Sequence, residues 1–324
     1  MELVVLGIDQ GNGNMKTASC VFPYGFKKQE TKPSELFSKD ILEYKGMYYS
    51  LTQNRFSYEI DKTQNENCLI LTLFAIAKEI KERAVKGKTD FDWNRDFKGF
   101  IGKDVVLAIG LPPAHFEKLR DPFKKYFLDA ARYGLDFKYN GKSFSFHIRE
   151  IYVFPQNYAA MMIYKSELIK KYSTVHGIDI GEGTVDLITL KNGMPDKDTM
   201  VSRDLGMSRL REKIIDDIIN DYNMTLDSST IEDILTPGRE VIAPEEIVVR
   251  VRQETAEWAS KIVDQLHTKV SDFRFAPTVF LGGGSKLLAP YLEATGMFGV
   301  VEYIDDICAN AVGYEEIAKM YLNG

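Results

Sequence analysis

The chain has 324 residues, 44% of them hydrophobic and 27% charged, which is typical of a globular protein long enough for two domains. Its formal net charge of −6 excludes the strongly basic surface that direct nucleic-acid binding usually needs. The cysteines, Cys20, Cys68 and Cys308, lie far apart without metal-ligand spacing, which argues against a disulfide framework or a zinc site. No apolar run could span a membrane or serve as a signal peptide, so we expect a cytoplasmic protein.

The first third of the chain predicts several strands and one long helix. Residues 3–8 are apolar and β-branched, as in a buried strand, and a glycine turn and a return strand (residues 15–22) follow. Apolar residues at helical spacing predict a helix over residues 66–86. Residues 104–113, DVVLAIGLPP, predict a second buried strand that two prolines end.

The rest of the chain alternates in the same way. We expect helices at 116–133, 156–171, 209–222, 244–270 and 309–322, a hairpin at 138–147, and strands before the glycine turns near 181 and 282. Pro244 is expected at the first helical position of its helix. Because strands and helices alternate without a Pro/Ser-rich linker, the pattern predicts an α/β fold with two similar lobes.

One glycine motif occurs twice. Residues 7–13 read Gly-Ile-Asp-Gln-Gly-Asn-Gly, and residues 177–183 read Gly-Ile-Asp-Ile-Gly-Glu-Gly. Glycine in such a hairpin permits positive φ and a close approach of the backbone, and the N–H groups of the turn can point together at an anion. Either copy alone could be an ordinary hairpin; the two copies in register predict two loops that bind the same polyphosphate.

The charges beside the two turns differ. Asp9 and Asp179 end their strands, where carboxylate oxygens suit Mg²⁺. Lys16 follows the first turn and can place a positive charge on phosphates, whereas the matching residue of the second copy is the acid Asp186. The first loop therefore favours an anion, and the second can favour metal and water.

A third glycine element, Gly282-Gly283-Gly284-Ser285, lies between a predicted strand and a predicted helix, where it can pack against a flat ring or a phosphate. Two common alternatives fail. The chain has no GxxxxGK[ST] motif, and the GxG turns lead into strands without the third spaced glycine of a dinucleotide fingerprint.

These elements, in this order, resemble the actin, chaperone and sugar-kinase ATPase superfamily. Residues 9–16, DQGNGNMK, match its first phosphate loop, DxGxGxxK, at every fixed position. Residues 179–186 look like the second phosphate loop, 280–288 like the adenosine motif, and 308–321 like the closing connecting helix. The resemblance implies a two-lobed, ribonuclease-H-like duplicated fold with a nucleotide cleft between domain I (residues 1–158 and 306–324) and domain II (residues 159–305).

The resemblance also implies the site. ATP or GTP would bind with Mg²⁺, which Asp9 and Asp179 would hold through water. Gln156, where the superfamily has a catalytic polar residue, would orient the attacking water, and Asp179 is a second candidate as base; alternatively, Gln156 only starts a helix after Pro155. The implied nucleotide-binding residues are those of the three loops: Asp9, Gly11, Asn12, Gly13, Asn14, Lys16, Gly181, Glu182, Gly183, Thr184, Gly282, Gly283, Gly284 and Ser285.

Within the superfamily, the length and the stretch AIGLPPAHF (residues 108–116) look most like the bacterial ParM/StbA plasmid-segregation actins. That group polymerises with ATP and moves DNA through an adaptor protein bound to centromere-like DNA. We therefore expect a homopolymer filament and an adaptor as partners, with no direct DNA or membrane binding. A glutamine at position 156, where the group often has glutamate, predicts slow hydrolysis coupled to assembly.

Other members of the superfamily are less compatible with the sequence. The chain ends directly after the predicted closing helix, so we expect no chaperone substrate-binding domain, and the Cys/His zinc motif of sugar kinases of similar length is missing. A non-segregating actin-like scaffold and a small-molecule kinase stay open as alternatives. One further hypothesis is that the basic helix around Lys78, Lys81 and Lys86 contacts the adaptor.

Overall fold

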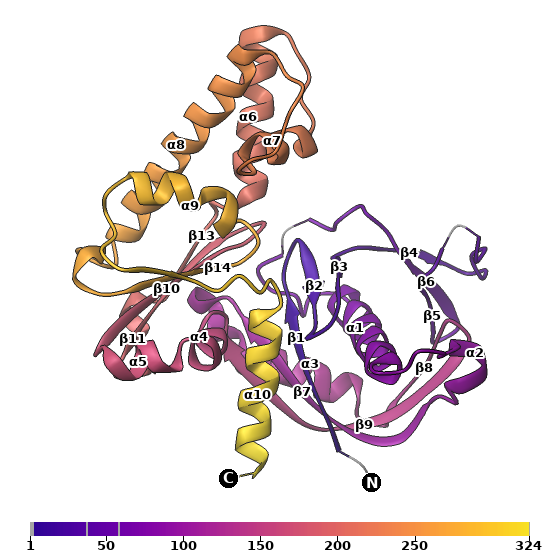
Figure 1. Ribbon diagram of the computed structural model, residues 1–324. Coiled ribbons are helices and arrows are strands. Elements are labelled where there is room, and N and C mark those ends of the chain that lie inside the picture. Colours follow the sequence, from indigo (N-terminus) through magenta and orange to yellow (C-terminus); the bar gives the residue numbers. More distant parts are fainter. Residues whose placement is uncertain (1–2, 37, 58, 324) are drawn as a thin grey trace. The chain divides into compact units, whose positions relative to one another are not determined.

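The computed structural model describes residues 3–36, 38–57 and 59–323, and its internal contacts divide the chain into two compact units (Figure 1). The first unit consists of residues 1–111, 115–155 and 308–324, and the second of residues 112–114 and 156–307. Each unit has its own sheet covered by helices and its own hydrophobic core. The predicted α/β class is therefore confirmed.

The sheet of the first unit has nine strands in the order β3-β2-β1-β7-β9-β8-β5-β6-β4. Its centre is parallel, since β7 pairs in parallel with both β1 and β9, and the flanking pairs are antiparallel. The strands are β1 (Leu3–Gln10), β2 (Asn14–Lys16), β3 (Val21–Pro23), β4 (Phe26–Gln29), β5 (Ile41–Tyr44), β6 (Met47–Leu51), β7 (Phe100–Leu111), β8 (Leu135–Tyr139) and β9 (Lys142–Pro155).

Helices cover both faces of this sheet. They are α1 (Asn67–Val85), α2 (Trp93–Asp96), α3 (Phe116–Ala130) and α10 (Ala309–Asn323). The sheet curls around α1, whose apolar residues share a core with Leu107 and Ile109 of β7 (Figure 1). Gly110, on the opposite face of β7, leaves room for the ring of Tyr314, because a Cβ there would overlap it. Helix α10 thus packs directly against β1 and β7.

The sheet of the second unit has the order β12-β11-β10-β14-β15, with β13 paired to β11. Its strands are β10 (Thr174–Ile180), β11 (Val185–Lys191), β12 (Met194–Pro195), β13 (Val201–Arg203), β14 (Thr278–Leu281) and β15 (Val301–Tyr303). Its helices are α4 (Tyr158–Tyr164), α5 (Ser166–Lys171), α6 (Met207–Tyr222), α7 (Ser228–Leu235), α8 (Glu245–His267) and α9 (Ser285–Ala294). Helices α6, α7 and α8 pack together beyond the sheet (Figure 1).

Some predicted elements differ in detail. The helix predicted over 156–171 is two helices, α4 and α5, which meet at Lys165 with φ −127°. The predicted return strand is divided into β2 and β3 by a turn in which Thr17 N donates to the Cys20 carbonyl at 2.9 Å. Pro244 precedes α8 instead of opening it, and α7 had no prediction.

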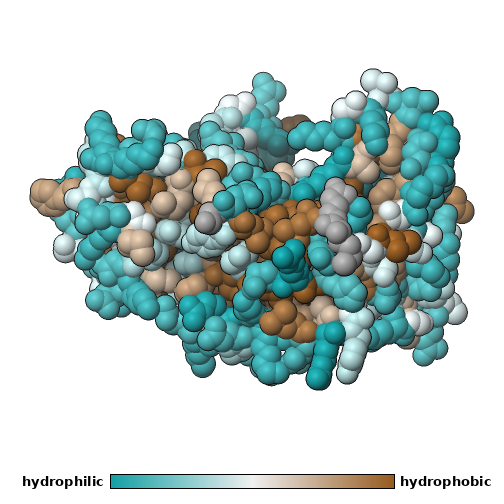
Figure 2. Space-filling model, turned by 90° about the horizontal axis from the view of Figure 1, so that it is seen from below, coloured by the Kyte–Doolittle hydropathy of each residue, from teal (hydrophilic) through white to brown (hydrophobic). Residues whose placement is uncertain are grey.

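None of the helices in the described part of the chain combines the length and apolar character needed to cross a membrane. On the face shown in Figure 2, hydrophilic side chains predominate and apolar ones gather in a central patch. Single exposed apolar residues are normal on protein surfaces, whereas a contiguous patch marks a candidate contact area.

Candidate functional site

The first glycine turn joins β1 to β2 in the first unit. The strands pair with Asp9 opposite Lys16, so both side chains lie on one face, and Lys16 Nζ is 3.4 Å from Asp9 Oδ2. Gly11 is required because a Cβ there would lie 2.7 Å from the carbonyl oxygen of Asn14. The structure therefore places the predicted residues of the first loop, from Asp9 to Lys16, together on one tight hairpin.

The carbonyl groups of this turn are bound from outside the hairpin. The Gly13 carbonyl accepts hydrogen bonds from Tyr24 N at 3.0 Å and from Arg55 Nε at 2.7 Å. The Gln10 carbonyl accepts one from Lys62 Nζ. In a trans peptide the C=O of one residue and the N–H of the next point in opposite directions. The N–H groups after these carbonyls therefore point away from Arg55 and Lys62.

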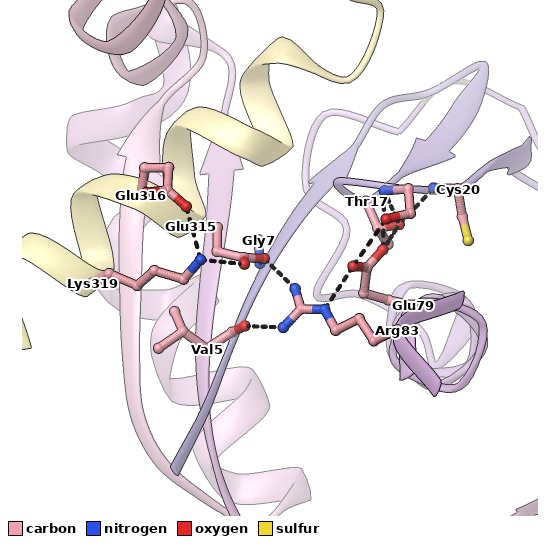
Figure 3. Close-up of polar contacts among 10 residues, drawn as sticks. Val5, Gly7, Thr17, Cys20, Glu79, Arg83, Glu315, Glu316 and Lys319 are labelled. Carbon is pink, nitrogen blue, oxygen red and sulfur yellow. Dashed lines mark hydrogen bonds and ion pairs between the residues drawn. The ribbon is translucent and has the colours of Figure 1, made fainter. Parts of the chain in front are cut away.

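A buried polar network fixes the residues that follow the first turn (Figure 3). Thr17 Oγ1 and Ser19 N donate to Glu79 Oε2 of α1 at 2.6 and 3.0 Å. Arg83, one helical turn later, donates to Glu79 Oε1 at 2.8 Å and to Glu315 Oε2 of α10 at 2.6 Å. The end of β2 is thus connected to the last helix of the chain.

The same network satisfies an open edge of β1. In the described residues only Asp9 and Gln10 of β1 pair with β2, so the earlier part of β1 has no strand on that side. Gly7 N donates to Glu315 Oε2 at 3.2 Å, and Val5 O accepts from Arg83 at 3.0 Å (Figure 3). Side chains here replace a strand partner, which keeps the edge covered and the backbone groups bonded.

The second glycine turn joins β10 to β11 in the second unit. Asp179 and Asp186 face each other across the two strands and are only 8% and 3% exposed. Thr184 Oγ1 donates to Asp186 Oδ2 at 3.0 Å, and Gly181 N donates to the Thr184 carbonyl at 2.9 Å. Two buried carboxylates on one face form a site that suits a hydrated cation.

The first turn of α6 binds the carbonyl groups of this second loop. Gly206 N donates to Gly183 O at 3.2 Å, Met207 N to Gly181 O at 3.1 Å, and Ser208 N to Glu182 O at 2.9 Å. These donors are the ones that an α-helix leaves unsatisfied at its start. With three successive carbonyls directed at α6, the N–H groups of residues 182–184 point the other way, as anion binding requires.

The side chain of Glu182 is also drawn toward α6. Its carboxylate forms an ion pair with Arg211 of α6, and Arg211 donates to Glu232 of α7 at 3.1 Å. The Arg211 side chain is only 10% exposed. This pairing draws the Glu182 carboxylate toward a cation and offsets part of its repulsion of a phosphate bound at the loop.

The third glycine element packs on the end of β10. Gly282 has φ 90°, and a Cβ there would overlap the Asp179 carboxylate and lie 2.6 Å from Ile180 O. Gly284 N donates to the same Ile180 carbonyl at 2.9 Å, and Ser285 Oγ donates to Gly282 O at 2.7 Å. The structure thus brings the second and third predicted loops together within the second unit.

Gln156 lies between β9 and α4, next to a residue with an unusual backbone. Asn157 has φ 73° and is fully buried, and its Nδ2 donates to Asp186 O at 3.0 Å. The position of Gln156 is therefore tied to the second hairpin through its neighbour. In the described residues no three His, Cys, Asp or Glu side chains lie close enough to hold a metal directly. Asp9 and Asp179 belong to different units, and their shared contact with Mg²⁺ stays a prediction.

Comparison with known families decides what the two halves are. A family model described as "Actin like proteins N terminal domain" matches residues 7–158, and one described as "Archaeal actin homologue MreB-like, C-terminal" matches residues 177–294. The chain belongs to the actin-like superfamily. No curated protein gave a sequence match.

Solved structures agree with the actin-like assignment. Ta0583, an archaeal actin homologue, matches with a TM-score of 0.74 and 18% identity over 98% of this chain and 99% of that chain. The apo pSK41 ParM protein matches at 0.70 and 15% identity, over 100% and 99%. A ParM from a 15-stranded filament of Clostridium botulinum matches at 0.70 and 17% identity, over 99% and 100%. At these identities the similarity shows the fold, and the predicted actin-like fold is confirmed.

Several residues of this actin-like site had no sequence signal. Lys62 and Arg55 come from a segment without periodicity, and Arg211 is one of many charged residues on α6. Gly206, directly before α6, is a signal that the sequence does contain. In the structure a Cβ added there would lie 2.6 Å from Thr184 N. Asn157, directly after the predicted Gln156, was missed because its positive φ is not readable from residue type.

Proposed function

We propose that this actin-like protein binds Mg-ATP through the phosphate loops of both units, hydrolyses it slowly and assembles into filaments. We further propose that the filaments segregate plasmid or other replicon DNA through an adaptor protein. The observation that carries the proposal is the orientation of the two glycine turns. In the second turn three successive carbonyls are bound from behind, and in the first turn the carbonyls of Gln10 and Gly13 are, so the N–H groups that follow them point to the other side, beside a carboxylate that ends the preceding strand.

The similar structures support this reading. Ta0583 was solved in complex with ADP, which suggests the adenine nucleotide as ligand here. ParM from Clostridium botulinum and Alp12 were solved as filaments, which suggests self-assembly.

The proposed chemistry assigns one role to each polar group. Mg²⁺, held through water by Asp9 and Asp179, would neutralise phosphate charge, and Lys16 would bind phosphate oxygens. Gln156 would orient the attacking water, since an amide can position water but cannot take its proton. Asp179 is the alternative base, although binding of the metal competes with that role.

A test of the proposed adaptor contact on α1 needs a lysine that can be changed without disturbing the first unit. Lys78 Nζ pairs with Asp40 Oδ1 at 3.0 Å, and Lys81 lies over the ring of Trp93 at 5.5 Å, so charge reversal at either residue would also disturb the first unit. Lys86 is exposed at the end of α1. Loss of adaptor-driven assembly in Lys86→Glu, with self-assembly intact, is the expected result for an adaptor contact there.

Calorimetric titration with ATP, ADP and GTP, with Mg²⁺ and with EDTA, tests the nucleotide site. We expect Mg²⁺-dependent binding of ATP and ADP. In a separate assay of phosphate release from ATP, we expect slow release that falls in Gln156→Ala and not in the exposed control Lys27→Met. Binding without hydrolysis would favour a non-segregating scaffold, and phosphate transfer to a small molecule would favour a kinase. Absence of nucleotide binding would contradict the proposal.

A further inference from the structure

The backbone carbonyls of the two phosphate loops are bound by different kinds of donor. A backbone carbonyl that faces a phosphate repels it, so each loop needs donors behind it that hold its carbonyls away. In the second loop these donors are the first N–H groups of α6. The first loop is followed in the chain by the short strands β2 and β3, and in the described residues its Gln10 and Gly13 carbonyls accept from Lys62, Arg55 and Tyr24 N instead of from the start of a helix.

Two cationic side chains occupy the corresponding place in the first unit. Lys62 Nζ donates to Gln10 O, and Arg55 donates to Gly13 O at 2.7 Å and to Asn14 Oδ1 at 3.4 Å. Both residues come from the segment between β6 and α1, outside every motif. They bind the carbonyls at the start and at the end of the turn.

The burial of Lys62 is costly and calls for a reason. The residue is 8% exposed, its ammonium group lies 4.7 Å from the centre of the Tyr24 ring, and the ion pairs of the described residues give it no carboxylate partner within 4 Å. Burial lowers the pKa of Lys62, while the nearby carboxylates of Asp9 and Glu59 act in the opposite direction. A buried cation with so little compensation is stabilised when an anion binds nearby.

We propose that Lys62 and Arg55 are positioning residues of the first phosphate loop, which hold the Gln10 and Gly13 carbonyls away from the phosphate side and place positive charge behind the polyphosphate. They replace, with side chains, the helix N-terminus that serves the second loop. The ligand they favour is the diphosphate or triphosphate part of a nucleotide, and the nucleoside part is not affected. This inference rests on the proposed function.

The test compares ligands that differ only in phosphate. Calorimetry would measure ATP, ADP and, by competition, adenosine binding to the full-length chain and to Lys62→Met, Lys62→Gln and Arg55→Gln. Lys27→Met, which removes an exposed lysine of β4, is the matched control. For Lys62→Met we expect ATP and ADP to bind about 10-fold to 100-fold more weakly, with adenosine and the control unchanged. Lys62→Gln keeps a donor for Gln10 O and separates the hydrogen bond from the charge.

The results separate a failure of the proposed nucleotide binding from a failure of the positioning role of Lys62 and Arg55. If the unaltered chain binds no nucleotide, the proposed function fails first. If it binds and folded Lys62→Met keeps its ADP affinity within a factor of 2, or loses all three ligands equally, the positioning role is wrong. Should the Lys62 variants not fold, Arg55→Gln decides, because Arg55 is exposed. Weaker ADP binding with unchanged adenosine supports the inference, and unchanged ADP binding overturns it.

Discussion

Replacement of Arg83 by methionine should destabilise the first unit strongly. The change removes the cation between Glu79 and Glu315, which are 2% and 5% exposed (Figure 3). Breaking a buried ion pair on one side typically costs about 3–5 kcal/mol. Here the Arg83 side chain is 32% exposed and Lys319 still pairs with Glu315 at 2.7 Å, so we expect about 3 kcal/mol. In a unit of this size that corresponds to a fall of about 10 °C in the thermal midpoint.

Urea unfolding at pH 7, followed by circular dichroism, measures this loss. Lys86→Met, an exposed lysine at the end of the same helix, is the control and should be near neutral. Combining Arg83→Met with Glu79→Gln and Glu315→Gln should recover a large part of the stability, because the uncompensated carboxylates are then gone. If Arg83→Met and Lys86→Met unfold at the same urea concentration, the network of Glu79, Arg83 and Glu315 does not stabilise the first unit and the reasoning is wrong.

Three further predictions concern single buried positions. Burial lowers the pKa of His176 to about 4, while the unfolded chain has the ordinary value of about 6.5, so stability should be unaffected by this group above pH 6.5 and fall by about 3 kcal/mol between pH 6.5 and 4. His176→Asn should flatten that part of a urea-midpoint curve against pH, and parallel curves would contradict this. Gly282→Ala, at φ 90°, should lower the thermal midpoint and weaken ADP binding, whereas Gly283→Ala, with nothing within 4 Å of its Cβ, should leave the midpoint unchanged; equal midpoints would count against the argument. Asn157→Ala should be about 1–3 kcal/mol less stable in urea than Asn157→Gly, which tolerates φ 73°; the reverse order would refute the strain at this residue.

The features that are set by residues close together in the chain could be predicted from the sequence. The repeated Gly-x-Gly pattern predicts both hairpins, and in the first a Cβ at Gly11 would lie 2.7 Å from Asn14 O; the placement of Asp9 opposite Lys16 follows from the length of the turn. The long helix α1 shows its apolar spacing directly. The break between α4 and α5 at Lys165 was not predictable, because neither proline nor glycine marks it.

Contacts between distant segments could not be predicted. Lys62 binds a carbonyl 52 residues away and Arg55 one 42 residues away, and only the folded sheet brings them behind the first loop. The same holds for the start of α6 behind the second loop. Each loop sequence indicates where a phosphate could bind, whereas the donors that orient the loop come from elsewhere in the fold.

The central claim, that nucleotide drives this chain into filaments, is tested most directly by right-angle light scattering of the pure protein with phosphate release recorded on the same sample. With Mg²⁺ and ATP we predict a rise in scattering above a threshold concentration, filaments in negative stain, and phosphate release that follows assembly. The rise should be absent with EDTA. Flat scattering over a wide range of concentrations, with nucleotide bound, would contradict the account.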